Sequence, residues 1–355
     1  MNMKDINIDL PFLNKISSKD KAFLARQLAT MLDSGLSLDK SLSVFVNQTR
    51  NTKFKQILEG VLSDVEGGLS FSDALKKHPE VFDDVYINII MSGEAVGKLA
   101  DVMRRLADTM EKQNVFMSQI KSALYYPGFV LGVMIVIVGV MITQVIPPLK
   151  DIFSEFDTEL PWTTHYLLVF SDFLVKYWYI VLLVILLLGV VLYFYFATKE
   201  GKYWIARFMI NLPSDLSKDV YMDRFAQTLS MLLKAGTPVI KSLSITSQVM
   251  NNIIYADAIN AAASQMERGV PLSVPLEKDK NFNPLVPQMI KVGEETGKID
   301  QVLENLSKYF EEQANTKLKN INSLIEPVLI VIIGLGVSFI VFAIIMPIYQ
   351  LVQLQ

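Results

Sequence analysis

The stretch GEAVGKLADVM at residues 93–103 returns as GEETGKIDQVL at residues 293–303. The two stretches share both glycines, the glutamate and the lysine, and the agreement continues downstream. At an offset of 200 residues, the matching positions are Gly93, Glu94, Gly97, Lys98, Val102, Leu106, Glu111, Gln113, Leu124 and Pro127, and Gly293, Glu294, Gly297, Lys298, Val302, Leu306, Glu311, Gln313, Leu324 and Pro327. A correspondence of this length indicates an internal repeat.

A glycine followed by a lysine can bind phosphate, so a nucleotide site is one reading of these stretches. A P-loop needs four residues between its glycines and a Ser or Thr after its lysine, because that hydroxyl holds magnesium. Here three residues separate Gly93 from Gly97, and Leu99 or Ile299 follows the lysine. A P-loop also follows a buried strand, whereas the residues before Gly93 repeat at helical spacing. The pattern argues against an ATP site.

The repeat extends upstream at an offset of 201 residues. There FLARQLATMLDSGLSLDKSL at residues 23–42 corresponds to RFAQTLSMLLKAGTPVIKSL at residues 224–243. The matching positions are Leu32, Gly35, Lys40, Ser41, Leu42, Gly68 and Ser72, and Leu233, Gly236, Lys241, Ser242, Leu243, Gly269 and Ser273. A whole domain and the apolar segment after it are therefore predicted to occur twice.

Composition favours a membrane protein. Hydrophobic residues make up 51% of the 355 residues, and the mean hydropathy is +0.35, which is high for a soluble chain. Stretches without charge have apolar cores at residues 129–146, 178–197 and 328–348, and about 20 apolar residues cross a bilayer. We predict three transmembrane helices, at residues 127–149, 177–198 and 327–349. The start of the chain, MNMKDINIDLPF, lacks the apolar region of a signal peptide, so none is expected.

Lysine and arginine predict the orientation of these helices. Basic residues flank the spans on one side: Arg104, Arg105, Lys112, Lys121, Lys199, Lys202, Arg207, Lys308, Lys317 and Lys319. The segment 150–176 has only Lys150 and Lys176 among several acidic residues, so the positive-inside rule places it outside the cell membrane. The repeat leads to the same topology, because two copies with one orientation need a helix that returns the chain, and residues 177–198 supply it.

Within each domain the apolar residues recur at helical spacing, and about six helices per domain are expected. The predicted fold class is an all-α membrane protein with two homologous cytoplasmic helical bundles and three transmembrane helices. The remaining boundaries are a leader at 1–17, a first cytoplasmic domain at 18–126, an extracytoplasmic loop at 150–176, a second cytoplasmic domain at 199–326 and an extracytoplasmic tail at 350–355.

Each glycine stretch is predicted to form a corner between two helices. Glycine tolerates the positive φ of a tight turn, and Glu94 or Glu294 is expected to offset the dipole of the long helix that follows, by about 0.3 to 1 kcal/mol. Packing alone explains such a corner. The alternative is that the corner also contacts a partner, for which the candidate residues are Gly93, Glu94, Gly97, Lys98, Gly293, Glu294, Gly297 and Lys298.

Pro127 and Pro327 lie where each long helix is expected to reach the membrane. Proline removes a backbone donor and favours a kink, so these residues are candidates for coupling a domain to its span. The alternative is that each proline only begins a new helix at the membrane surface.

The two glycine phrases before long amphipathic helices, the segments at 23–42 and 224–243, and the three spans resemble the PilC/GspF family of inner-membrane platform proteins. The resemblance covers nearly the whole chain. It implies a platform of a type IV pilus or type II secretion machine, bound by a hexameric assembly ATPase and feeding pilins or pseudopilins into a filament. Other inner-membrane proteins of the alignment complex are further implied partners.

The residues favour no catalysis and no cofactor. The chain has no cysteine, and neither His78 nor His165 has metal ligands at suitable spacing. A net charge of -3 gives no reason to expect a nucleic-acid partner. Apart from membrane lipid, we expect self-association, most simply a homodimer. A small-solute transporter remains the alternative function, although spans without an internal charge offer little to line a pathway.

Overall fold

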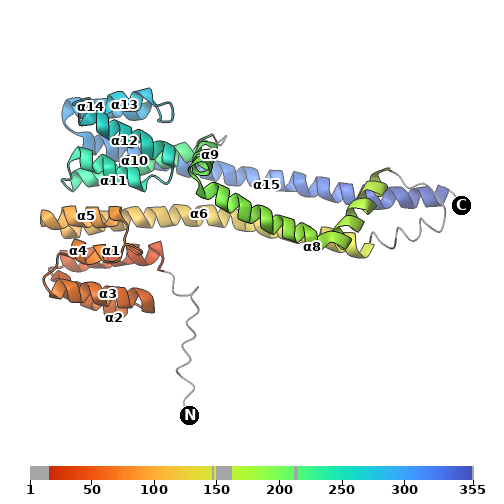
Figure 1. The fold of residues 1–355 in the computed structure, drawn as a ribbon, viewed down its shortest axis with the longest axis horizontal. Coiled ribbons are helices and arrows are strands. Elements are labelled where there is room, and N and C mark those ends of the chain that lie inside the picture. The colour runs from red at the N-terminus through yellow and green to blue at the C-terminus, as the bar shows by residue number, and fades with distance from the viewer. Residues whose placement is uncertain (1–15, 146–147, 149–161, 212–214, 354–355) are drawn as a thin grey trace, which may run out of the picture. The chain divides into compact units, whose positions relative to one another are not determined.

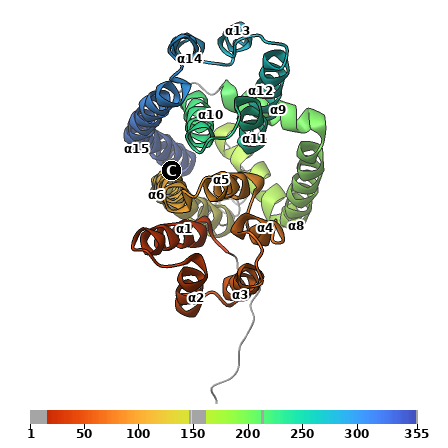
Figure 2. The same ribbon diagram turned by 90° about the vertical axis from the view of Figure 1, so that its left-hand side faces the viewer.

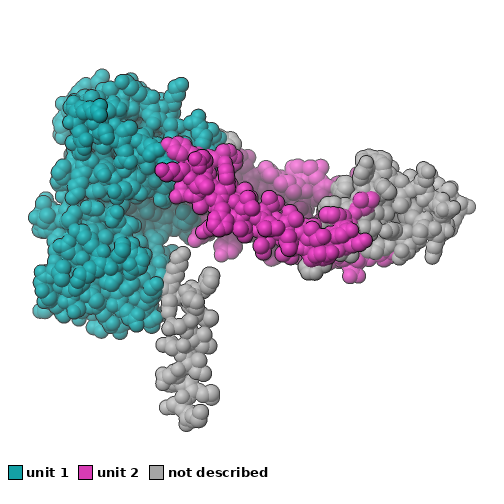
Figure 3. Space-filling view, in the orientation of Figure 1, with its two compact units in different colours: residues 1–118, 206–315 teal, residues 119–205, 316–355 magenta. Residues whose placement is uncertain are grey.

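The structure is a computed structural model that describes residues 16–145, 148, 162–211 and 215–353. Every regular element in these residues is a helix, which confirms the predicted all-α fold (Figure 1). The chain divides into two compact units (Figure 3). One unit combines Met1–Ser118 with Ala206–Asn315, and the other combines Gln119–Ile205 with Thr316–Gln355.

Five helices and the first part of a sixth form what we call the first bundle. They are α1 (Ser18–Asp33), α2 (Leu38–Gln48), α3 (Thr52–Glu66), α4 (Phe71–Lys76), α5 (Asp84–Ala95) and the start of α6 (Leu99–Val140). Their apolar faces meet in a core in which Leu24, Leu58 and Phe82 are fully buried. The aromatic rings of Phe54, Phe82 and Tyr86 pack in sequence through this core.

Polar residues at the helix starts explain where these helices begin. Ser17 and Asp20 form a capping box at α1, in which each side chain accepts a hydrogen bond from the other residue's backbone N–H. The Oδ1 of Asp83 accepts from the backbone N–H of Tyr86 at 2.9 Å and caps α5. Asn51 caps α3 in the same way. Each cap satisfies a backbone donor that has no partner inside its helix.

The second bundle repeats the first. It consists of α10 (Leu216–Lys234), α11 (Val239–Val249), α12 (Ile253–Met266), α13 (Ser273–Lys278), α14 (Leu285–Thr296) and the start of α15 (Ile299–Gln353), and α9 (Lys199–Ile210) precedes it. The order and lengths follow those of α1 to α6, so the expectation of about six helices per domain is confirmed. The backbone repeats as well, since φ is +87° at Gly35 and +85° at Gly236.

An ion pair between the first and last helix of each bundle is also repeated, with its charges exchanged. Asp33 on α1 pairs with Arg104 on α6 in the first bundle. At the equivalent positions of the second bundle, Lys234 on α10 pairs with Glu304 on α15. Because the charge at both positions is reversed together, the attraction survives in both copies.

The two bundles belong to one unit and are in contact. Helix α5 of the first bundle packs against α10 and α11 of the second (Figure 2). Leu232 and Ile245 of the second bundle are buried as part of the first bundle's apolar core. The hydroxyl oxygens of Ser92 and Thr237 lie 2.7 Å apart across the contact.

Three helices are long and apolar enough to cross a membrane: α6, α15 and α8 (Trp162–Ala197), with the span in α8 at Tyr179–Ala197. Their apolar windows are hardly buried inside the protein, and Phe129, for example, is 72% exposed. Bare apolar surface of this extent is typical of helices that contact lipid. The prediction of three transmembrane helices is confirmed.

Two details were not predicted from the sequence. Helix α6 ends at Val140 and is followed by a π-helical turn, η1 (Met141–Val145). Helix α8 starts at Trp162, so part of the segment expected as a loop is helical. The backbone leaves the helical conformation at Tyr177 (φ −118°, ψ 18°), which is where the second span was predicted to begin. The rest of that loop, at 150–161, residues 146, 147 and 149 of the predicted first span, and residues 1–15 of the leader lie outside the described residues.

Candidate functional site

The first corner is a glycine-terminated helix end. Helix α5 ends at Ala95, and Gly97 adopts φ +67°. The backbone N–H of Lys98 donates to the carbonyl of Gly93 at 2.8 Å, and that of Gly97 donates to Glu94 at 3.1 Å. This pair of bonds closes the helix in a Schellman motif, in which the left-handed residue is usually glycine.

The second corner has the same backbone. Gly297 adopts φ +70° after α14, and the N–H of Lys298 donates to the carbonyl of Gly293 at 2.9 Å. The prediction that these stretches are turns between helices is therefore confirmed at Gly97 and Gly297. A side chain at either position would strain the backbone.

Gly93 and Gly293 have a different role from the one expected. They lie in the last turn of α5 and of α14, not between helices. A Cβ on Gly93 would come within 2.6 Å of Cγ2 of Val102, and a Cβ on Gly293 within 2.9 Å of Cα of Ile299. Both distances are well below ordinary contact, so glycine is needed here because the long helix passes too close for any side chain.

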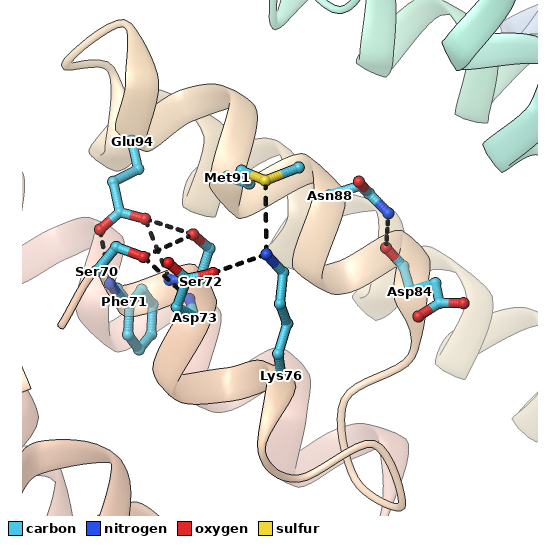
Figure 4. A network of polar contacts seen from close by, with 9 residues as sticks. All are labelled: Ser70, Phe71, Ser72, Asp73, Lys76, Asp84, Asn88, Met91 and Glu94. Carbon is cyan, nitrogen blue, oxygen red and sulfur yellow. Dashed lines mark hydrogen bonds and ion pairs between the residues drawn. The ribbon is translucent and has the colours of Figure 1, made fainter. Parts of the chain in front are cut away.

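Glu94 does not act on the long helix, which corrects the expectation for this residue. Its carboxylate accepts hydrogen bonds from the backbone N–H of Phe71 (2.6 Å) and of Ser72 (3.1 Å) and from the hydroxyl of Ser72 (2.7 Å) (Figure 4). It therefore caps the N-terminus of α4, where a negative charge is also favoured by the helix dipole. The expectation failed because Glu94 is still inside α5, and its side chain points toward the start of α4 instead of toward the start of α6.

Glu294 makes the same connection in the second bundle. Its carboxylate accepts from the backbone N–H groups of Leu272 and Ser273 and from the hydroxyl of Ser273, the last at 2.6 Å. Sequence reasoning missed this link because the partners are more than twenty residues apart. One signal was available, since Ser72 and Ser273 had already been matched as repeat positions.

The surface of each corner is formed by other residues. Lys98 and Lys298 are exposed, whereas Glu94 and Glu294 are half-buried, and Gly93 and Gly293 are buried. If a partner binds at a corner, the lysines and the turn itself are what it meets.

A cluster of charged residues at the bundle contact was not anticipated from the sequence. Nζ of Lys112 on α6 lies 2.7 Å from Oε2 of Glu311 on α15. Beside this pair, Asp223 on α10 accepts a hydrogen bond of 2.6 Å from the hydroxyl of Ser307. Burial raises the pKa of Asp223 to about 6, although the Ser307 hydrogen bond partly opposes the rise. The signal in the sequence was weak, because Asp223 stands beside Arg224 in a helix that mixes apolar and polar residues.

Both candidate coupling prolines lie inside continuous helices. Helix α6 runs through Pro127 and α15 runs through Pro327, so neither proline begins a new helix. Each proline leaves the carbonyl four residues earlier, on Ala123 or Ser323, without its usual helical donor. The structure thus places a weakened turn at the expected position in each copy.

Among the described residues, no group of three or more His, Cys, Asp or Glu side chains is placed to hold a metal ion. The two corners and their glutamate caps instead fix the positions of the helices that they join and expose a turn with a lysine. Two equivalent bundles, each followed by an apolar helix, and a third apolar helix define an all-α multi-pass membrane protein built by duplication.

Comparison with known proteins identifies the family. The pattern of type II secretion system (T2SS) protein F matches residues 24–147 and again 225–347. The matches start 201 residues apart and end 200 apart, which are the offsets of the repeat. The chain belongs to this family.

Relatives come from two kinds of machine. The chain is 34% identical to the type IV pilus assembly protein PilC of Thermus thermophilus, over 94% of this chain and 83% of that protein. It is 32% identical to PilC of Myxococcus xanthus, over 99% and 84%. It is also 32% identical to the type II secretion system protein F of Vibrio cholerae, over 97% and 85%.

Proposed function

We propose that this chain is the inner-membrane platform protein of a type IV pilus or type II secretion machine. The observation that carries the proposal is the double match to the T2SS protein F family, which covers both bundles and the apolar helix after each. Relatives that match over most of their length, one named for pilus assembly and one for type II secretion, also support it.

In this proposal both bundles, at 18–126 and 199–326, lie in the cytoplasm, and the segment 150–176 and the tail 350–355 lie outside. The basic residues before the first and third spans and after the second favour this orientation. It also follows from the repeat, because equivalent bundles enter their spans in the same direction.

The bundles then offer a cytoplasmic surface to the hexameric assembly ATPase, and the spans meet pilins or pseudopilins in the bilayer. We assign the ATPase contact to the corners, where Lys98 and Lys298 are exposed. The repeat supports this assignment, since the two equivalent corners could bind equivalent sites on two subunits of a hexameric ATPase.

The test is replacement of the gene in its own host. A strain without the chain should lose surface filaments or secreted substrate, while the levels of pilin and ATPase stay normal. The wild-type chain should restore the lost process, and which one returns identifies the machine. As a matched control, Asn260→Asp, an exposed change on α12, should restore it equally well. Normal filaments and normal secretion in the strain without the chain would refute the proposal.

A further inference from the structure

The contact between the two bundles uses different faces of equivalent structures. The first bundle contributes α5 and the start of α6, which we call its leading face. The second contributes α10 and α11, which we call its receiving face, and Glu311 of α15 lies at the edge of the contact. By the repeat, α14 and the start of α15 form the leading face of the second bundle, and α1 and α2 form the receiving face of the first. The contact is therefore heterologous, a head-to-tail arrangement.

Within the described residues, α14 of the second leading face and α1 and α2 of the first receiving face are not used in the bundle contact, and α15 takes part only at its edge, through Glu311. Helix α14 and helix α2 lie on opposite sides of the contact between α5, α10 and α11 (Figure 2). Because they point away from each other in the same unit, one chain cannot bring them together. Pairing these two faces with each other therefore needs a second molecule.

The residues on the unused faces are equivalent to residues that are in contact. Ser92 of α5 meets Thr237, and Thr237 is 8% exposed. Their equivalents are Val292 on the free leading face, 48% exposed, and Leu36 on the free receiving face, 39% exposed. The free pair is thus apolar on both sides, whereas the paired positions carry hydroxyl groups.

A second pair of positions follows the same rule. Ile245 of the used receiving face is buried, while its equivalent Val44 is 39% exposed. On the leading face, Thr109 lies against Met231, and the equivalent of Thr109 is the exposed Tyr309. Val44 and Tyr309 are thus large exposed side chains at positions equivalent to contact positions, and the equivalent of Met231 is the exposed Thr30.

The ion pair at the edge of the bundle contact has no equivalent on the two unused faces. The ion pair Lys112–Glu311 would be replaced by Glu312 facing Glu111. Glu111 already accepts from Arg26, which lies within 2.6 Å of it and also pairs with Asp108. The like charge is therefore offset by Arg26, and the apolar centre provides the attraction.

We propose that a second copy of this chain fills these faces, with α14 of one molecule on α1 and α2 of the next. The interface would repeat between molecules the contact that exists within each one. A heterologous contact of this kind forms a closed ring when its rotation permits, so bundles from successive chains would alternate around one axis. The proposal depends on the repeat and the bundle contact alone, and not on the machine that the protein serves.

Cysteine cross-linking tests the interface, because the chain has no cysteine of its own. Membranes in which Val292→Cys chains and Leu36→Cys chains are produced together should yield a disulfide-linked dimer, since equivalent side chains touch within the chain. Ser92→Cys with Thr237→Cys in one chain should link internally and serves as the positive control. Glu59→Cys with Asn260→Cys, equivalent exposed positions on α3 and α12, should yield little dimer.

Native mass measurement of the full chain in nanodiscs provides the second arm. Val292→Asp and Leu36→Asp should each shift the oligomer to monomer, because a charge is placed in an apolar contact, and Asn260→Asp should not. The helix content measured by circular dichroism should be unchanged, since both sites are exposed in one molecule. The proposal is overturned if the Val292–Leu36 dimer is no more abundant than the control dimer, or if the aspartate variants remain fully oligomeric.

Discussion

At Glu94, three hydrogen-bond donors from two residues converge on one carboxylate and tie the end of α5 to the start of α4. Glu294 repeats the link in the second bundle. Glutamate at this position in both copies is therefore explained by its structural role as a cap of the neighbouring helix. The exposed lysines beside it make no such link, so we assign the proposed partner contact to them.

Glu94→Ala should destabilise the first bundle by about 2 kcal/mol, because donors on the buried residues Phe71 and Ser72 lose a charged acceptor. This exceeds the 0.3 to 1 kcal/mol expected of an exposed dipole contact. Thermal unfolding in detergent measures the loss. Glu295→Ala is the matched control, since it is exposed at the neighbouring position of the second corner and is alanine in the first. A Glu94→Ala chain as stable as wild type would contradict the structural role.

Asp223 predicts a pH dependence. Its folded pKa is about 6 against a usual 3.8, so the folded state binds the proton more tightly than the unfolded state. The stability due to this group is therefore complete below about pH 4 and is lost as the pH rises through about 6. Asp223→Asn should be more stable than wild type by roughly 1 to 2 kcal/mol at about pH 7.5, and the gain should shrink near pH 5. Unfolding curves with the same pH dependence for both proteins would show that Asp223 ionises normally.

At the scale of helices, the sequence predicted the features that depend on residues close together in the chain. The glycine corners and the apolar runs predicted the helices and spans. Contacts across the fold could not be predicted, because periodicity shows which face is buried and not against what. The cap made by Glu94 and the packing of α5 on α10 and α11 are both of this kind. The helix from Trp162 was missed because acidic residues just before it resemble a loop.

The prolines are tested at this scale as well. Pro127→Ala with Pro327→Ala restores a backbone donor to each long helix and should stiffen the turn where bundle and span join. If movement of a bundle tilts its span, filament assembly should fall several-fold while membrane level and ATPase binding stay unchanged. Gly128→Ala, beside the first proline and in open space, adds no donor and should assemble normally. Assembly at the normal rate by the double variant would remove the coupling role.

At the scale of the whole molecule, duplication explains the odd number of spans and the pairing of two equivalent bundles in one unit. It also gives the chain two equivalent corners, each with an exposed lysine on a rigid turn. A platform that recruits a cytoplasmic ATPase requires such a surface on the membrane's inner side. We therefore propose that the bundles themselves, without other machine components, bind the ATPase.

Vesicle flotation with the purified full-length chain and the assembly ATPase of the same organism tests that claim most directly. Vesicles with the bundles outward should carry the ATPase upward, and empty vesicles should not. Lys98→Glu with Lys298→Glu should weaken binding about thirtyfold, if each of the two lost contacts is worth about 1 kcal/mol. Lys53→Glu, an exposed change on α3, should leave binding intact. If the wild-type vesicles leave the ATPase behind while their bundles are folded and outward, the proposed platform role is contradicted.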